Sequence, residues 1–283
     1  MQKLQCTLTA LASTAALSLA SAANAAILFD FGSVDGAGAY SVDATANPDL
    51  GGPAGLTGTV HWNSVYGADS DSVSDVASGL VDSSNAALTG VSLDLGTGSD
   101  TSINWASQPK ARVGWGAGGR SSTGVFANDT FRDFIANESS ESTIGLRISG
   151  LDAGTYDVWV ISRMTYTNND DITNDDYDIY VGAGGTSTAP NSLSTDSIQQ
   201  YSRNNASANT DTWAEGDGFT WVKLQATVDG SNDLLVFSES TYNNQNGLIN
   251  AVQVSLVPEP ASLALMGLGS MLMFVRRRRG TDG

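Results

Sequence analysis

The chain has 283 residues, of which 41% are hydrophobic, enough for the core of one sandwich-sized domain or two small ones. Its formal net charge is −17, and between Ala26 and Val257 eight basic residues stand against 28 acidic ones, a net charge of −20. Such an acidic surface repels nucleic acid and anionic lipid and attracts divalent cations, which excludes nucleic-acid binding.

Residues 1–25 have the pattern of a secretory signal peptide. Lys3 precedes an apolar stretch from Leu8 to Ala20, and small residues at positions 23 and 25 predict cleavage before Ala26. Cys6, the only cysteine, lies inside this segment. The exported chain therefore has no thiol, which excludes disulfides, thiolate catalysis and cysteine-ligated metals.

Short strands with alternating apolar side chains follow from Ala26 onward. Ile27–Phe31 places its odd-numbered residues on one face, and Thr143–Leu151 places its apolar residues on one face and Arg147 on the other. Thr155–Arg163 comes directly after a turn at Asp152–Gly154. We therefore expect the strands on either side of this turn to pair as a hairpin.

The rest of this region continues the same pattern. Further strands are predicted at Tyr177–Val181, Phe219–Val228, Leu234–Ser238 and Leu248–Leu256, with a turn at Asp229–Asn232. Phe131–Ala136 is the one internal segment that suits a helical turn, so we expect less than a tenth of residues 26–256 to be helical. Many short strands between Gly, Asn, Asp and Ser turns predict an all-β fold, one antiparallel β-sandwich.

Several short motifs in this region resemble those of known surface domains. They are Trp62–Val65, Gly79–Ser84, Leu88–Leu93, Gly150–Arg163 and Gly247–Val254. Together they are similar to bacterial surface domains with a galactose-binding-like or malectin-like jelly roll. The resemblance spans nearly all of residues 26–256 and implies a jelly-roll-like sandwich, in a class whose members often bind carbohydrate.

Five aromatic side chains lie in or near predicted loops or at polar-facing strand positions. Sugar rings stack their C–H faces on exposed aromatic rings, so these side chains are candidates for ligand binding: Trp62, Trp115, Tyr166, Trp213 and Trp221. The alternative for each is that it packs in the core or covers a sheet. The sequence leaves both roles open.

The segment Asn168–Asp178 is the densest cluster of oxygen ligands. Its five carboxylates are candidates for a weak calcium site: Asp170, Asp171, Asp175, Asp176 and Asp178. Calcium takes six to eight oxygen ligands, so a loop of this composition beside a strand could hold one ion. The alternative is a solvated acidic loop.

No motif in the chain selects a catalytic centre. His61 is the only histidine, and neither a G-x-S-x-G elbow nor a metal-type histidine pair surrounds it. A carboxylate pair for glycoside hydrolysis would be identified by its separation and not by sequence spacing. We expect a protein that is not an enzyme, with a secreted polysaccharide-active enzyme as the alternative.

The C-terminal segment 257–283 has three parts. Val257–Pro260 reads Val-Pro-Glu-Pro, residues 261–275 carry no charge, and Arg276, Arg277, Arg278 and Arg279 follow. A 15-residue helix reaches about 22 Å, short of the ~30 Å hydrocarbon core, so this segment spans a membrane only marginally. The arginines favour the cytoplasmic side, which leaves residues 26–257 outside.

This order of parts resembles the PEP-CTERM sorting signal of Gram-negative bacteria that make extracellular polysaccharide. The resemblance implies recognition of the motif and removal of the tail by exosortase, a membrane protease-transferase. It also implies an inner-membrane intermediate followed by transfer to the cell surface or matrix. From physics alone, a plain C-terminal anchor with a stiff Pro-Glu-Pro linker is the alternative.

The function predicted from the sequence is that of an exported cell-surface or matrix protein that is non-catalytic. Its expected partners are an exosortase-type enzyme, the membrane before processing, and carbohydrate or exopolysaccharide. A purely structural matrix or biofilm component is the alternative to glycan binding. Calcium is the one cofactor that the composition favours.

Overall fold

The computed structural model describes residues 25–32, 38–67, 73, 79–112, 125, 128–137, 141–162, 176–193, 199–204, 213, 215, 221–240 and 247–258. Its strands are β1 (Ala26–Gly32), β2 (Gly38–Asp43), β3 (Thr59–Tyr66), β4 (Ser92–Ser99), β5 (Ser102–Asn104), β6 (Lys110–Arg112), β7 (Phe134–Ala136), β8 (Thr143–Ser149), β9 (Gly154–Ile161), β10 (Asp176–Gly184), β11 (Gln199–Asn204), β12 (Val222–Val228), β13 (Asp233–Ser240), β14 (Leu248–Ile249) and β15 (Ala251–Leu256). Within these residues the one α-helix is α2 (Asp129–Arg132), besides 3-10 turns at Pro48–Gly51 and Pro190–Ser192. The predicted all-β fold with almost no helix is confirmed.

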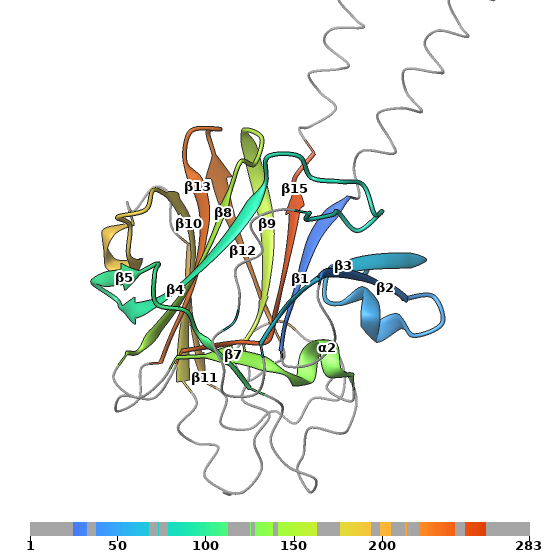
Figure 1. The fold of residues 1–283 in the computed structure, drawn as a ribbon, viewed down its shortest axis with the longest axis horizontal. Coiled ribbons are helices and arrows are strands. Elements are labelled where there is room, and N and C mark those ends of the chain that lie inside the picture. Colours follow the sequence, from blue (N-terminus) through green and yellow to red (C-terminus); the bar gives the residue numbers. More distant parts are fainter. Residues whose placement is uncertain are drawn as a thin grey trace, which may run out of the picture. The chain divides into compact units, whose positions relative to one another are not determined.

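The strands form two six-stranded sheets and one small sheet (Figure 1). The first sheet has the order β12-β9-β15-β1-β3-β2, and the second has the order β11-β10-β13-β8-β4-β5. The third sheet contains β14, β7 and β6. Apolar side chains of the two large sheets share one core, which makes the fold the β-sandwich expected from the alternation.

One strand pair departs from the predicted antiparallel pattern. β1 pairs with β3 in parallel, with Phe29 opposite Asn63, while β2 pairs with β3 antiparallel. β2 therefore lies two positions from β1 in the sheet, and β3 lies between them. Sequence alternation does not contain this information, because a strand has the same period in either orientation.

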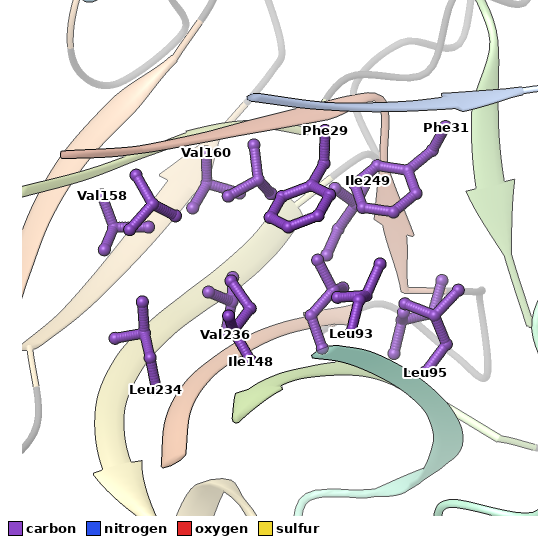
Figure 2. Close-up of a cluster of buried hydrophobic side chains, with 14 of the residues drawn as sticks. Phe29, Phe31, Leu93, Leu95, Ile148, Val158, Val160, Leu234, Val236 and Ile249 are labelled. Atoms are coloured by element: carbon purple, nitrogen blue, oxygen red, sulfur yellow. The ribbon is translucent and has the colours of Figure 1, made fainter. Parts of the chain in front are cut away.

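The main core lies between the two large sheets. Figure 2 shows side chains of β1 and β9 facing those of β4, β8 and β13. The labelled residues of these strands are Phe29, Phe31, Val158, Val160, Leu93, Leu95, Ile148, Leu234 and Val236. The odd-numbered face predicted for β1 and the even-numbered apolar face predicted for β8 both point into this core, as expected.

A second core covers part of the outer face of the first sheet. Leu28, Val60, Trp62 and Ala251 pack there with Phe131 of α2, so β1 is buried on both faces. The 3-10 segment at Pro48–Gly51 is held to this face by Gln253. The Gln253 amide nitrogen donates to the carbonyl of Gly51 at 3.1 Å, and its oxygen accepts from the N–H of Ala54 at 2.8 Å.

The predicted hairpin between residues 143–151 and 155–163 is wrong. β8 pairs with β13 and β4 in the second sheet, whereas β9 pairs with β12 in the first. The turn between them is present, but it carries the chain across the core from one sheet to the other. In this arrangement the apolar faces of the two strands meet across the core (Figure 2).

β12 and β13 are joined in the same way. The predicted turn at Asp229–Asn232 is confirmed, because the carboxylate of Asp229 accepts from the N–H groups of Ser231 at 2.8 Å and Asn232 at 3.1 Å. These two strands also belong to different sheets. Turn chemistry therefore identified where the chain reverses and left open which sheet it enters.

Two predicted segments are divided in the structure. Leu248–Leu256 is broken at Asn250 into β14 of the third sheet and β15 of the first. The buried Asn250 amide donates to the carbonyls of Phe131 and Asp133, at 3.1 and 3.2 Å, which fixes this corner. Phe131–Ala136 begins in α2 but continues as β7, so only its first part is helical.

Candidate functional site

Three of the five aromatic side chains predicted to bind sugars lie within the described residues, and all three belong to the second core: Trp62, Trp213 and Trp221. Trp115 and Tyr166 lie outside the described residues. Trp62 is 0% exposed, its indole N–H donates to the carbonyl of Leu50 at 3.2 Å, and its ring meets Phe131 edge-on at 5.4 Å. No face of this ring is therefore open to a ligand.

Trp213 and Trp221 are only partly buried against the same core. The Trp213 ring meets Phe131 edge-on, with ring centroids 4.8 Å apart. The indole N–H groups of both tryptophans have no hydrogen-bond partner in the part of the chain that the structure describes. A buried donor without an acceptor is uncommon in a folded protein, so this edge of the core holds two unused donors.

Beside this core, the outer face of β9 and β12 carries three cross-strand pairs at its surface (Figure 1 shows the two strands side by side). We call these six side chains the β9/β12 strip: Trp159 opposite Lys223, Asp157 opposite Gln225, and Thr155 opposite Thr227. Their neighbours along each strand point into the main core. The alternation of two buried sheet faces thus leaves this row directed outward.

Hydrogen bonds and charge connect the strip along its length. The Lys223 ammonium lies 2.8 Å from a carboxylate oxygen of Asp157 and 5.0 Å from the centre of the Trp159 ring. The Gln225 amide nitrogen donates to the other Asp157 oxygen at 2.6 Å, and the hydroxyls of Thr155 and Thr227 are 3.0 Å apart. The strip therefore combines one aromatic ring, one internally paired charge, one amide and two hydroxyls.

Trp159 was not among the residues predicted to bind a ligand. A signal for it exists in the sequence, because Tyr156, Val158 and Val160 alternate as core positions and leave Asp157 and Trp159 on the polar side. Its partners Lys223 and Gln225 have no comparable signal. Only the register of β9 with β12 brings them opposite Trp159 and Asp157.

A second tryptophan–cation pair lies on the outer face of the second sheet. The guanidinium of Arg147 is 5.0 Å from the centre of the Trp105 ring and forms a hydrogen-bonded ion pair with Asp94. The Trp105 indole N–H donates to the carbonyl of Thr186 at 2.7 Å. The ring rests on Gly96 and Gly145, where a Cβ atom would lie 2.9 and 3.0 Å from it.

Most of the predicted calcium ligands cannot be placed. Asp170, Asp171 and Asp175 lie outside the described residues, while Asp176 begins β10 and Asp178 is its third residue. Asp178 is therefore a strand residue, directly opposite Glu239 of β13. Among the described residues, no group of three or more His, Cys, Asp or Glu side chains could hold a metal ion.

Acidic groups gather around Tyr180 on the outer face of the second sheet. The Tyr180 hydroxyl lies 3.3 Å from Glu239 and 3.4 Å from Asp178. Burial, together with both carboxylates, raises the pKa of Tyr180 above its usual range. Burial also raises the pKa of Glu239, and the neighbouring charges of Asp100 and Asp178 raise it further.

The tail lies almost entirely outside the described residues. Val257 and Pro258 follow β15, whereas Glu259, Pro260, the predicted span 261–275 and Arg276–Arg279 are not described. In the described part of the chain no helix has the length and apolar character needed to cross a membrane.

Comparisons with known proteins give little about the sandwich itself. The K1 cleaved adhesin domain of Lys-gingipain from Porphyromonas gingivalis W83 is 12% identical, covers 44% of this chain and 74% of its own, and has a TM-score of 0.27. The K3 cleaved adhesin domain of the same protein is 11% identical, covers 81% of this chain and 99% of its own, and has a TM-score of 0.25. No curated protein matches, and the resemblance to galactose-binding-like or malectin-like domains is not confirmed.

The tail gives a specific match. Residues 256–279 match the PEP-CTERM protein-sorting motif, over the same segment that the sequence singled out. Such a motif implies processing by exosortase-type sorting machinery and export to the surface of a Gram-negative cell. The chain therefore carries a PEP-CTERM sorting signal that follows, in sequence, a β-sandwich domain.

Proposed function

We propose that this protein is a non-catalytic, surface-sorted protein that binds extracellular polysaccharide through the β9/β12 strip. The observation that carries the proposal is the outward row of Trp159, Asp157 and Gln225 beside Lys223, on strands whose other face is core. A purely structural matrix component would need no such row.

The chemistry of the strip suits a sugar chain. An aromatic ring offers a flat apolar surface to the C–H face of a pyranose, while an amide, a carboxylate and hydroxyls match the sugar hydroxyls at its edge. From Thr155 to Trp159 the strand advances about 13 Å at ~3.3 Å per residue, room for a short run of sugar units. Trp221 comes just before β12, near the Ile161 end of β9, and is half-buried against the second core.

The same residues argue for binding without hydrolysis. Glycoside hydrolysis uses two carboxyl groups on either side of the scissile bond. Asp157 is the single carboxylate of the strip, and it is already engaged by Lys223 and Gln225. The imidazole of His61, on β3, makes no hydrogen bond or ion pair within the described residues, so it supports no nucleophile there.

The binding proposal is tested by co-sedimentation of the full chain with the polysaccharide of its own host and with insoluble reference glycans. Because the full chain includes the uncharged apolar segment 261–275, it is kept in detergent. The detergent should have polyoxyethylene head groups, because sugar head groups would compete with the glycan for the strip. We expect Trp159→Ala to abolish co-sedimentation, and Trp105→Phe, a milder tryptophan substitution on the outer face of the other sheet, to leave it intact. Absence of binding to every glycan, or equal binding by Trp159→Ala, would contradict the proposal.

The sorting proposal has a separate test. We expect Glu259→Ala to leave export intact while the protein accumulates, unprocessed, in the inner membrane. Cell fractionation followed by immunoblotting measures both the location and the size of the product. Normal release of the variant would mean that Pro258, Glu259 and Pro260 form only a linker.

A further inference from the structure

We infer that the ligand of the β9/β12 strip is an uncharged polysaccharide, an inference that rests on the binding function proposed above. The argument starts from Lys223, the one cation of the strip. An acidic glycan would need this ammonium group as its partner. Whether Lys223 is available therefore decides the class of ligand.

Lys223 is already paired on two sides. Its Nζ lies 2.8 Å from Asp157 and 5.0 Å from the centre of the Trp159 ring. The side chains of Lys223 and Asp157 are 35% and 18% exposed, so the pair forms at the surface of the strip. A uronate or sulfate bound to Lys223 would have to approach the Asp157 carboxylate and would meet its repulsion.

The charge of the whole exported region acts in the same direction. Residues 26–257 carry a net charge of −20, which repels a polyanion before contact. An uncharged sugar chain meets no such barrier. Its hydroxyls both donate and accept, so they can match the hydroxyls of Thr155 and Thr227 without breaking the Lys223–Asp157 pair.

The test compares two soluble polymers with one backbone and different charge, hydroxyethyl cellulose and carboxymethyl cellulose, by affinity electrophoresis of the full chain in a sugar-free detergent. We expect the uncharged polymer to retard the protein about tenfold more strongly at ~0.01 M salt, where the Debye length is about 30 Å. Dextran and carboxymethyl dextran form a second pair for a different linkage. Equal or stronger retardation by the charged polymers would overturn the inference and leave the binding function standing.

Lys223→Met removes the one cation of the strip, and methionine retains most of its apolar stem. We expect the preference for the uncharged polymer to persist in this variant, because the wild-type lysine is already paired with Asp157. Retardation by the charged polymers that is clearly stronger for the wild type than for Lys223→Met would assign the lysine to an anionic ligand and overturn the inference. If Trp159→Ala instead abolishes a dimer seen by analytical ultracentrifugation, the strip is an interface between copies, and both proposals fail.

Discussion

The two outer faces of the sandwich carry the same kind of pair in different surroundings. On the second sheet Trp105 lies 5.0 Å from Arg147, and on the first sheet Trp159 lies 5.0 Å from Lys223. Trp105 rests on two glycines, and its indole N–H is bonded to the Thr186 carbonyl. The Trp159 indole makes no hydrogen bond within the described residues, and none of the described glycines whose surroundings are known has this ring among its nearest neighbours.

Both rings are half-buried, and they differ in what holds them: the Trp105 indole N–H is bonded to another segment, whereas the Trp159 indole N–H bonds to no described residue. Trp105 ties the segment around β5 to the loop after β10 and packs with Phe237 at 6.4 Å between ring centroids. Trp159 lies opposite Lys223 of the neighbouring strand. An equal cation–π distance therefore does not distinguish the roles of the two tryptophans. The hydrogen bonding of the indole N–H and the residues that pack under the ring do distinguish them.

The largest change in stability is expected for Trp105, on the outer face of the second sheet. We expect Trp105→Ala to lower the free energy of unfolding by about 3 kcal/mol, because it removes a large packed side chain and leaves Arg147 without its ring. Urea unfolding followed by far-UV circular dichroism measures the change. A loss as small as that of Trp159→Ala would remove the distinction between the two faces.

The next largest change in stability is expected at the glycines under the Trp105 ring, Gly96 and Gly145. At Gly96 an added Cβ would lie 2.8 Å from Ile103 and 2.9 Å from the Trp105 ring, so Gly96→Ala should cost about 1–3 kcal/mol through overpacking. Gly185→Ala is the matched control, since nothing lies within 4 Å of its added Cβ. Thermal melts of the two variants should differ by several degrees, and equal melts would mean that the ring does not press on Gly96.

Trp159→Ala should show the opposite profile. Because the Trp159 ring has a cation–π partner but is not packed on glycines as Trp105 is, its removal should lower the free energy of unfolding by about 1 kcal/mol or less. Binding to the uncharged polymer should nevertheless be lost. A melting temperature that falls as far as that of Trp105→Ala would make Trp159 a packing residue, and the binding proposal would lose its basis.

The smallest change in stability is expected for Glu239, on the outer face of the second sheet. Its pKa is raised in the folded protein, so the folded state binds this proton more tightly, and stability falls as pH rises through that pKa. Glu239→Gln removes a negative charge that burial disfavours and that the carboxylates of Asp100 and Asp178 repel, and it should stabilise the protein by about 0.2–1 kcal/mol at pH 7. The gain should vanish in acid, where the wild-type carboxyl is protonated. A gain that is independent of pH would point to packing instead of charge.

Much of the architecture was predictable from local pattern. The inward faces of β1 and β8, the turn at Asp229–Asn232 and the scarcity of helix all follow from residue alternation and turn chemistry. The sorting motif was predictable for a different reason, because its tripeptide, apolar run and arginines are contiguous in the chain. Signals of this kind need no partner from elsewhere in the sequence.

The partners of each strand and the exposure of each tryptophan were decided by tertiary structure. β8 and β9 look like a hairpin locally, yet they enter different sheets and their apolar faces meet across the core. Trp62 and Trp159 both occupy outward positions on strands of the first sheet. Trp62 is buried because its indole N–H donates to the carbonyl of Leu50 and its ring packs against Phe131. Neither residue contacts Trp159 in any interaction that the structure shows among the described residues. Alternation fixes the side of a sheet on which a residue lies, but segments remote in sequence decide whether that side meets solvent.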